Sequence, residues 1–140
     1  MSDQKIVFPS REWVNRYCNE LSNSEDYNKA GKGWKDPILF KVNEEAGLQF
    51  EVSRFILKLM DGKCTSVDFP LNESQAIAPF IIEASYDNWK KVIEGKINPT
   101  QAMLTGQLKV KGNMALLLRY STAAIAMVKA AQRVPTQFMK

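Results

Sequence analysis

The chain has 140 residues, which suits one compact domain, and its 45% apolar and 24% charged content is typical of a globular protein. It contains no histidine, which excludes Ser-His-Asp and Cys-His catalysis and every metal site that uses histidine. The net charge of +4 is concentrated in residues 71–140, which hold nine Lys and Arg against four Asp and Glu. These basic residues could interact with an anionic membrane surface. They are too widely spaced to predict a nucleic-acid partner.

The N-terminal residues predict the compartment, and the cysteines predict the redox state. Residues 1–5 lead into no apolar run of signal-peptide length, so we expect a cytoplasmic protein. Cys18 and Cys64 lie far apart with no motif around them, and we expect two reduced, buried thiols, although a disulfide is also compatible with the sequence. Two cysteines cannot hold zinc alone, so we predict no metal and no other cofactor.

Two helices are predicted before residue 34. Ser10 is a good N-cap for an amphipathic helix of about three turns, which runs to about Leu21. Ser24 can cap a short second helix through Ala30, which the glycine at position 31 ends.

From residue 34 the apolar period changes to two, which predicts strands. A hairpin is expected from strands at 38–43 and 48–60, with a bulge or strand break near residues 53 and 54, where the apolar phase slips. Asp61-Gly62 predicts a tight turn into a strand at 64–69, and a further strand is expected at 80–86.

The C-terminal half is predicted to be mainly helical. Asp87 is the expected N-cap of a helix over 88–94, and Asn98-Pro99 opens a short helix. A strand is expected at 106–111, and Asn113 is expected to cap one long helix to about Arg133. The apolar surface of that last helix is unusually wide, which predicts either burial on nearly all sides, or a flank that faces a partner chain, a cavity or a membrane.

The carboxylates offer no sign of acid–base chemistry. Glu25-Asp26 and Glu44-Glu45 lie in predicted surface turns, where neither carboxyl group would be desolvated. The glycines form no phosphate-binding loop. We therefore expect that the protein is not an enzyme.

Residues 87–114 carry a specific pattern. It contains the segments Asp-Asn-Trp, Glu-Gly-Lys-Ile-Asn-Pro, Ala-Met-Leu-Thr-Gly and Gln-Leu-Lys-Val-Lys-Gly-Asn-Met in this order. This stretch resembles the sterol carrier protein family, the type-two sterol-binding domain, and the order of elements before it resembles the family more loosely. The resemblance covers residues 1–140 as one domain. It implies an α+β fold in which a single five-stranded, mostly antiparallel sheet is covered by helices on one face, with an apolar tunnel between them.

Candidate ligand-binding residues come from the resemblance and from alternation. The resemblance implies that tunnel-facing positions are occupied by Met103, Leu104, Leu108, Val110, Met114, Leu117 and Leu118. Alternation along the strands and helices adds a set of inward-facing side chains, namely Phe40, Phe50, Val52, Leu57, Ile82, Trp89 and Tyr120.

The resemblance implies noncovalent binding, and possible intracellular transfer, of a fatty acid, fatty acyl-CoA or sterol-like lipid. The basic residues Lys90, Lys91, Lys96 and Lys109 would then allow transient membrane contact. The alternative is a non-catalytic accessory domain of a lipid- or thioester-processing enzyme complex. Its long C-terminal helix would dock on a partner enzyme or on a second copy.

Overall fold

The computed structural model describes residues 4–140, so the first three residues of the N-terminal segment considered above lie outside it. The helices are α1 (Arg11–Ser22), α2 (Glu25–Ala30), α3 (Tyr86–Ile93), α4 (Pro99–Thr105), α5 (Met114–Arg119) and α6 (Ser121–Gln132). The strands are β1 (Ile6–Val7), β2 (Ile38–Val42), β3 (Arg54–Met60), β4 (Lys63–Asp68), β5 (Phe80–Ala84), β6 (Lys109–Lys111) and β7 (Thr136–Gln137).

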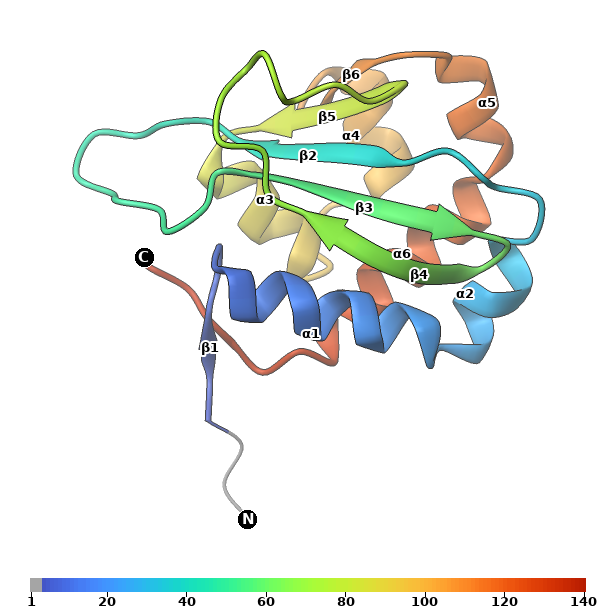
Figure 1. The fold of residues 1–140 in the computed structure, drawn as a ribbon, viewed down its shortest axis with the longest axis horizontal. Coiled ribbons are helices and arrows are strands. Elements are labelled where there is room, and N and C mark those ends of the chain that lie inside the picture. Colours follow the sequence, from blue (N-terminus) through green and yellow to red (C-terminus); the bar gives the residue numbers. More distant parts are fainter. Residues whose placement is uncertain (1–3) are drawn as a thin grey trace.

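Five strands form one sheet in the order β4-β3-β2-β5-β6, with the helices on one side of it (Figure 1). Only β2 and β5 pair in parallel within this sheet, and its other pairs are antiparallel. This confirms the predicted α+β fold with a mostly antiparallel five-stranded sheet. A separate two-stranded sheet joins β1 to β7, so the two ends of the described chain lie side by side.

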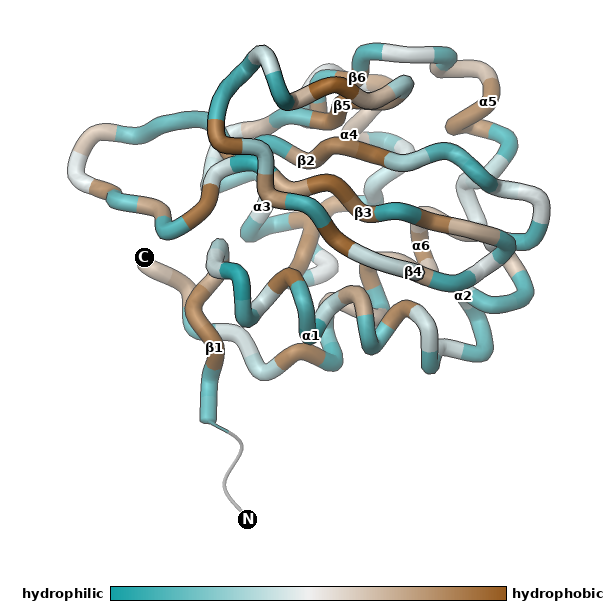
Figure 2. Tube along the Cα trace, viewed as in Figure 1, coloured by the Kyte–Doolittle hydropathy of each residue, from teal (hydrophilic) through white to brown (hydrophobic). Residues whose placement is uncertain are grey.

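The sheet has an inner face that packs against the helices. Phe40 on β2 pairs with Phe55 on β3 and with Ile82 on β5, so these three side chains point to the same face. All three are buried in the main core together with residues of every helix. The tube in Figure 2 shows the same pattern as apolar segments in the middle of the strands and an alternation of apolar and polar residues along α1.

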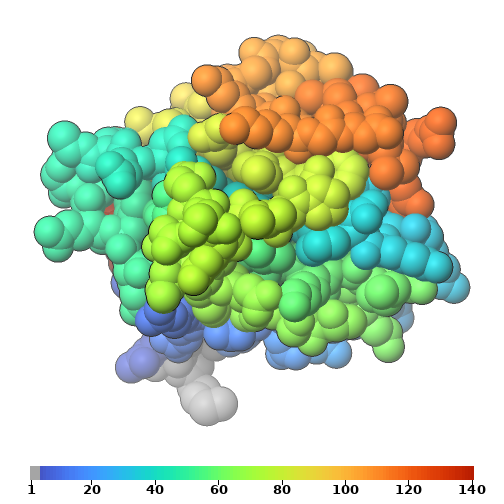
Figure 3. All heavy atoms as spheres, turned by 45° about the horizontal axis from the view of Figure 1, so that its top comes forward, coloured from blue at the N-terminus to red at the C-terminus, as the bar shows by residue number. Residues whose placement is uncertain are grey.

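The outer face of the sheet is covered by a loop. Leu39 and Ile56 are buried there against Ala76 of the segment between β4 and β5, which crosses this face (Figures 1 and 3). Glu73 in that segment accepts hydrogen bonds from Arg54 at 2.7 Å and from Lys41 at 3.0 Å, and these bonds hold the pKa of its carboxyl below the usual value. These ion pairs connect the loop to β2 and β3.

Side-chain caps begin the helices largely as predicted. Ser10, Ser24, Asn98 and Asn113 each accept a backbone N–H from the first turn of the following helix. The predicted cap at Asp87 is wrong, because Ser85 accepts from the Asn88 N–H and the helix begins at Tyr86.

The predicted strand at 48–60 is confirmed only from residue 54, where β3 begins and pairs with β2, and its first part, 48–53, is wrong. After β2 the chain forms a loop, and pairing resumes only where the Val42 N–H donates to the Ser53 carbonyl at 2.8 Å, just before β3 begins at Arg54. The alternation in this stretch comes from loop residues that pack inward. Phe50, for example, stacks on Tyr86 with 5.7 Å between the ring centroids.

The long C-terminal helix is interrupted at Tyr120. This residue leaves the helical conformation with φ −101° and ψ 30°, and it separates α5 from α6. Its ring packs edge-on against Trp34 at 5.1 Å. The prediction of one continuous helix from residue 113 to residue 133 is therefore wrong, because a tertiary contact outweighs the local helical pattern.

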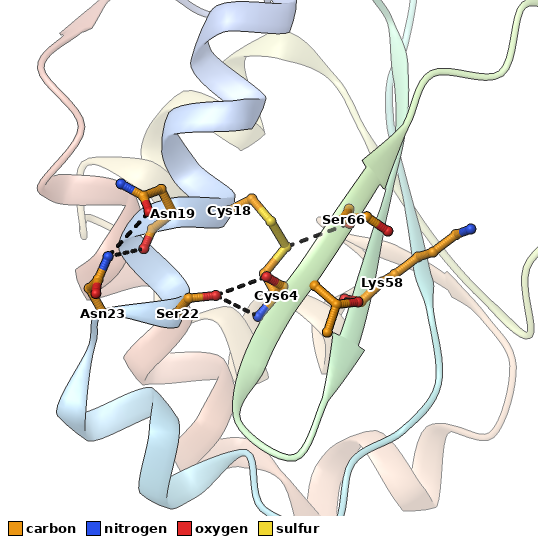
Figure 4. The surroundings of a disulfide bond; sticks show 8 residues. Cys18, Asn19, Ser22, Asn23, Lys58, Cys64 and Ser66 are labelled. Carbon is orange, nitrogen blue, oxygen red and sulfur yellow. Dashed lines mark hydrogen bonds between the residues drawn. A yellow bond between two sulfur atoms is a disulfide. The ribbon is translucent and has the colours of Figure 1, made fainter.

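The two cysteines form a disulfide, so the prediction of reduced thiols is wrong. Cys18 on α1 is bonded to Cys64 on β4, 46 residues away in sequence (Figure 4). Beside it, the Ser22 hydroxyl donates to the Cys64 carbonyl at 2.8 Å and accepts from the Cys64 N–H at 3.0 Å. The pairing depends on how α1 packs on the sheet, and no local motif encodes it. Within residues 4–140, none of the helices has the length and hydropathy that a bilayer crossing requires.

Candidate functional site: an apolar cavity

An apolar cavity with a volume of about 110 Å³ lies between the inner face of the sheet and the helices, where the resemblance implies a tunnel. Seven of the predicted site residues line it, namely Phe40, Ile82, Trp89, Met103, Leu108, Leu117 and Tyr120. Their role as ligand contacts stays a prediction.

Sequence reasoning missed most of the cavity wall. The missed residues are mainly aromatic side chains of the first half of the chain and small or flexible side chains of α6, namely Phe8, Trp13, Tyr17, Tyr27, Trp34, Ile38, Val42, Phe55, Leu59, Val92, Ile93, Pro99, Ala123, Ala124, Met127, Val128 and Ala131. The periodicity of α1 places Trp13 and Tyr17 on its buried face, but periodicity does not separate the cavity wall from solid core.

The wall contains no ionisable acid or base apart from tyrosine, and its tryptophans turn their polar edges away from the cavity. The indole N–H of Trp13 donates to Thr136 Oγ1 at 2.9 Å, that of Trp34 to the Asp36 carbonyl at 2.6 Å, and that of Trp89 to the Lys41 carbonyl at 2.8 Å. Because these three indole N–H groups donate to residues that do not line the cavity, the tryptophans contribute mainly aromatic carbon to its wall, and the other lining groups are largely aliphatic or aromatic. Such a site favours apolar ligands and offers nothing to hold a metal ion.

Helix α6 supplies the small side chains that leave space. Ala123, Ala124 and Ala131 line the cavity together with Met127, at spacings that put them on one side of the helix. Alanine leaves volume that a larger residue would fill, and the flexible methionine can change rotamer around a ligand. These features suit a cavity that changes volume when it is occupied.

Part of the cavity wall on α4 and α6 is only half-buried. The half-buried lining residues are Pro99 on α4 and Ala124 and Val128 on α6. Leu104, next to the cavity residue Met103, is 64% exposed on the outside of α4. The expectation that Leu104 faces the cavity is therefore wrong, because adjacent positions on a helix point in different directions.

Six further predicted residues lie outside the cavity wall. Leu57 and Val52 are buried in packed regions of the protein. The others are half-buried around the core, namely Phe50, Val110, Met114 and Leu118. All six side chains are buried or half-buried, but none of them lines the cavity.

Two tyrosines of the wall are deeply buried. The Tyr17 hydroxyl donates to the Met127 carbonyl at 3.0 Å, and burial raises the pKa of Tyr17 well above its usual value. Burial also raises the pKa of Tyr27 to about 12. Both phenols are therefore neutral at physiological pH.

These pKa shifts predict a loss of stability in alkali. Below pH 10 the Tyr17 and Tyr27 hydroxyls are protonated in both the folded and the unfolded protein. Above pH 10 they ionise in the unfolded chain but stay neutral in the folded protein, where they are buried. Each tyrosine then lowers the free energy of unfolding by up to about 1.4 kcal/mol per pH unit. Denaturant unfolding at pH 9, 10 and 11 measures this, and Tyr27→Phe should show a shallower decline. Equal slopes for the variant and the wild type would contradict the assignment.

Comparison with known proteins identifies the family. The model of the SCP-2 sterol transfer family matches residues 14–124. The chain belongs to this family. A crystal structure of sterol carrier protein 2 is 33% identical with a TM-score of 0.82, over 89% of this chain and 97% of that one. The solution structure of a conserved hypothetical protein, possibly sterol carrier protein, from Thermus thermophilus is 32% identical with a TM-score of 0.83, over 97% and 94% of the two chains.

Curated relatives of this SCP-2 family member are much longer proteins. Hydroxysteroid dehydrogenase-like protein 2 of Bos taurus is 35% identical over 60 residues, which are 43% of this chain and 14% of the relative. The human protein of the same name is 40% identical over 42 residues, which are 30% of this chain and 10% of the relative. The match therefore covers a small part of these relatives.

Proposed function

We propose that the protein binds a hydrophobic lipid noncovalently in the cavity and transfers it inside the cell. The observation that carries this proposal is an apolar cavity without charged side chains, in a chain of the SCP-2 sterol transfer family. Fatty acids, fatty acyl-CoA and sterol-like lipids are the ligand classes to test. No catalytic step is proposed, because the wall offers no carboxylate, amine or thiol to a reacting group.

The cavity volume indicates that binding requires expansion. About 110 Å³ is less than the roughly 300 Å³ or more of typical small-molecule sites. The half-buried residues between α4 and α6 and the flexible side chains of Met103 and Met127 are the parts of the wall that can yield. We infer that the ligand widens the cavity from this side.

The expected affinity is at best micromolar. Burying a dozen CH₂ groups supplies about 10 kcal/mol, from which the ordering of the lipid and the widening of the cavity subtract. A micromolar Kd corresponds to about 8 kcal/mol.

Transient membrane contact is part of this proposal. The exposed Leu104 lies on the helix that borders the half-buried part of the wall, and the Lys96 side chain before the same helix is 68% exposed. Lys96 pairs with Glu94 at 3.3 Å, so an anionic membrane surface would compete with that carboxylate for the ammonium group.

The small volume also favours a second candidate, a non-catalytic accessory domain whose cavity stays closed. It would act beside a lipid- or thioester-processing enzyme or as a homodimer. The C-terminal helix offers a smaller docking surface than one continuous helix would, because it is divided into α5 and α6. The buried alanines of α6 pack against neighbouring elements, so only exposed positions such as Ile125, which is 39% exposed, are available to a partner.

A direct binding experiment separates the two candidates. The purified protein is extracted and analysed by mass spectrometry for bound lipid, and it is titrated with a fluorescent fatty acid and a fluorescent sterol. The carrier proposal expects saturable binding with a micromolar Kd. A folded protein that binds none of the probes and carries no lipid would contradict it and favour the accessory domain.

A further inference from the structure

A groove lies in the protein surface between α2 and α6, and it is separate from the cavity. Residues of these two helices line it, and none of them lines the cavity. The groove has a volume of about 440 Å³, whereas the cavity has about 110 Å³. Typical small-molecule sites have roughly 300 Å³ or more, so the groove can hold a ligand without any movement of the helices.

The groove and the cavity lie on opposite sides of α6. The groove residues of this helix are at positions 122, 125, 126 and 129, a spacing that places them on one face. The cavity residues are at positions 123, 124, 127, 128 and 131, which form the opposite face at about 3.6 residues per turn. Ile125 and Ala126 therefore extend the apolar surface of α6 beyond its cavity side, which accounts for the wide apolar surface predicted from the sequence.

The floor of the groove is aliphatic. Ala126 on α6 is 3% exposed, and Ala30 on α2 is half-buried. Ile125 also lines the groove and is 39% exposed. A hydrocarbon chain on this floor would remove the apolar surface of Ile125 from water, which favours binding.

Two lysines without ion-pair partners line the groove. Lys29 on α2 and Lys129 on α6 are both exposed, and within residues 4–140 neither forms an ion pair. Asp26 contributes the carboxylate among the lining residues, so the groove has two positive charges against one negative charge. Each ammonium group is a flexible donor of up to three hydrogen bonds, which suits an anion.

We propose that the groove binds a single-chain amphiphile with an anionic head group, which is a carboxylate or a phosphate. The head group pairs with Lys29 and Lys129, and the hydrocarbon lies on Ile125 and Ala126. A free anion would use only the lysines and a neutral hydrocarbon only the floor, so an amphiphile is the ligand that matches both. This site goes beyond the function proposed for the cavity, whose wall contains no Lys or Arg.

Binding in the groove is expected to be weaker than binding in the cavity. The groove is open, so water still covers one side of a bound chain, and exposed ion pairs each contribute little. We expect a Kd of about 0.1 mM for dodecanoate. High salt should weaken the binding further, because ions screen the two ammonium groups.

NMR titration of the Ala123→Phe variant with dodecanoate tests the proposal, since the added ring fills the cavity and leaves the groove residues unchanged. We expect the amide signals of residues 26–30 and 122–129 to shift on binding. Adding Lys29→Gln and Lys129→Gln should weaken the binding about tenfold. The matched control, Lys35→Gln with Lys63→Gln, removes the same charge at exposed lysines outside the groove and should bind as before.

Two single changes in the groove have opposite expected effects. Asp26→Asn removes the carboxylate that repels the head group, and it should tighten binding severalfold. Ile125→Ser removes aliphatic contact with the chain, and it should weaken the binding of dodecanoate and of dodecyl phosphate alike. Affinities that respond to neither change would contradict the proposal.

Different outcomes of these experiments overturn different claims. If the loss of Lys29 and Lys129 leaves the affinity unchanged, the groove is not the site and the carrier proposal stands. If acetate or inorganic phosphate binds as tightly as dodecanoate, the ligand is a free anion and the amphiphile is wrong. If light scattering shows a dimer that Ile125→Ser dissociates, the groove is an interface between two copies and the proposal is wrong. Dodecanoate in the groove of a wild type that binds no lipid in its cavity would support this inference and contradict the proposed function.

A measurement on the wild type covers the case in which Ala123→Phe does not fold. A fatty acid with a nitroxide label on its chain, added at millimolar concentration, should broaden the amide signals of Lys29, Ile125 and Lys129. If these three signals stay sharp at saturation, the proposal is overturned.

Discussion

Replacing Met103 with aspartate is expected to weaken lipid binding more than hundredfold, whereas the same change at the adjacent Leu104 should alter it less than about twofold. Met103 is 6% exposed and lines the cavity, while Leu104 is 64% exposed on the outside of α4. A carboxylate at position 103 would bring water or an unpaired charge into the cavity, and a loss of about 2.7 kcal/mol is already hundredfold.

Titration of the two variants with the same fluorescent fatty acid measures this difference. Circular dichroism first establishes that both variants fold. A second pair avoids the charge: Ala123→Phe fills the cavity from α6, and Ala115→Phe adds the same ring at an exposed position of α5. Equal affinities within both pairs would show that the lipid binds elsewhere.

Removing the disulfide is expected to lower the free energy of unfolding by about 4 kcal/mol. The bond closes a loop of 46 residues, and the chain-entropy model assigns a cross-link of this span about that value. Denaturant unfolding of the Cys18→Ala, Cys64→Ala double variant measures the loss. The disulfide also holds α1, which carries the cavity residues Trp13 and Tyr17, so we expect weaker lipid binding as well.

Reduction of the wild type provides the control for this prediction. Dithiothreitol should reproduce most of the stability loss of the double variant, and it should have no effect on that variant. A change below about 1 kcal/mol in both experiments would mean that the packing of α1 on β4 alone holds these elements together.

Local chemistry explains which elements could be predicted from the sequence. Ser10, Ser24 and Asn98 mark helix starts because each cap is a hydrogen bond to a residue two or three positions later. The strands at 38–42 and 80–84 follow from period-two alternation, since one face of each is buried in the helix-covered core. The resemblance over residues 87–114 then implied the number of strands in the sheet and its mostly antiparallel pairing, but not the strand order.

The failed predictions depend on contacts that are distant in sequence. Phe50 packs inward from a loop, so its alternation with polar neighbours imitates a strand. The break at Tyr120 involves Trp34, and the disulfide depends on α1 reaching β4. No window of neighbouring residues contains this information.

The cavity was the hardest feature to predict. Leu57 and Ile82 both lie on the inner face of the sheet, and alternation predicts both equally well as cavity-lining residues. Only Ile82 lines the cavity. A void depends on the volumes of side chains that meet from different elements, such as alanines of α6 opposite aromatic rings. Hydrophobic periodicity gives the direction of a side chain but not the distance to what faces it.

The pairing of β1 with β7 makes the two ends of the described chain a common outer support for the cavity wall. Thr136 accepts the indole N–H of Trp13, and the Tyr86 hydroxyl donates to the Phe8 carbonyl and accepts from the Met139 N–H. Phe8 and Trp13 belong to the cavity wall. A fusion partner or an affinity tag that pulls the tail away from β1 is therefore expected to weaken the lipid binding proposed for this cavity, although residues 136–139 are not part of the cavity wall.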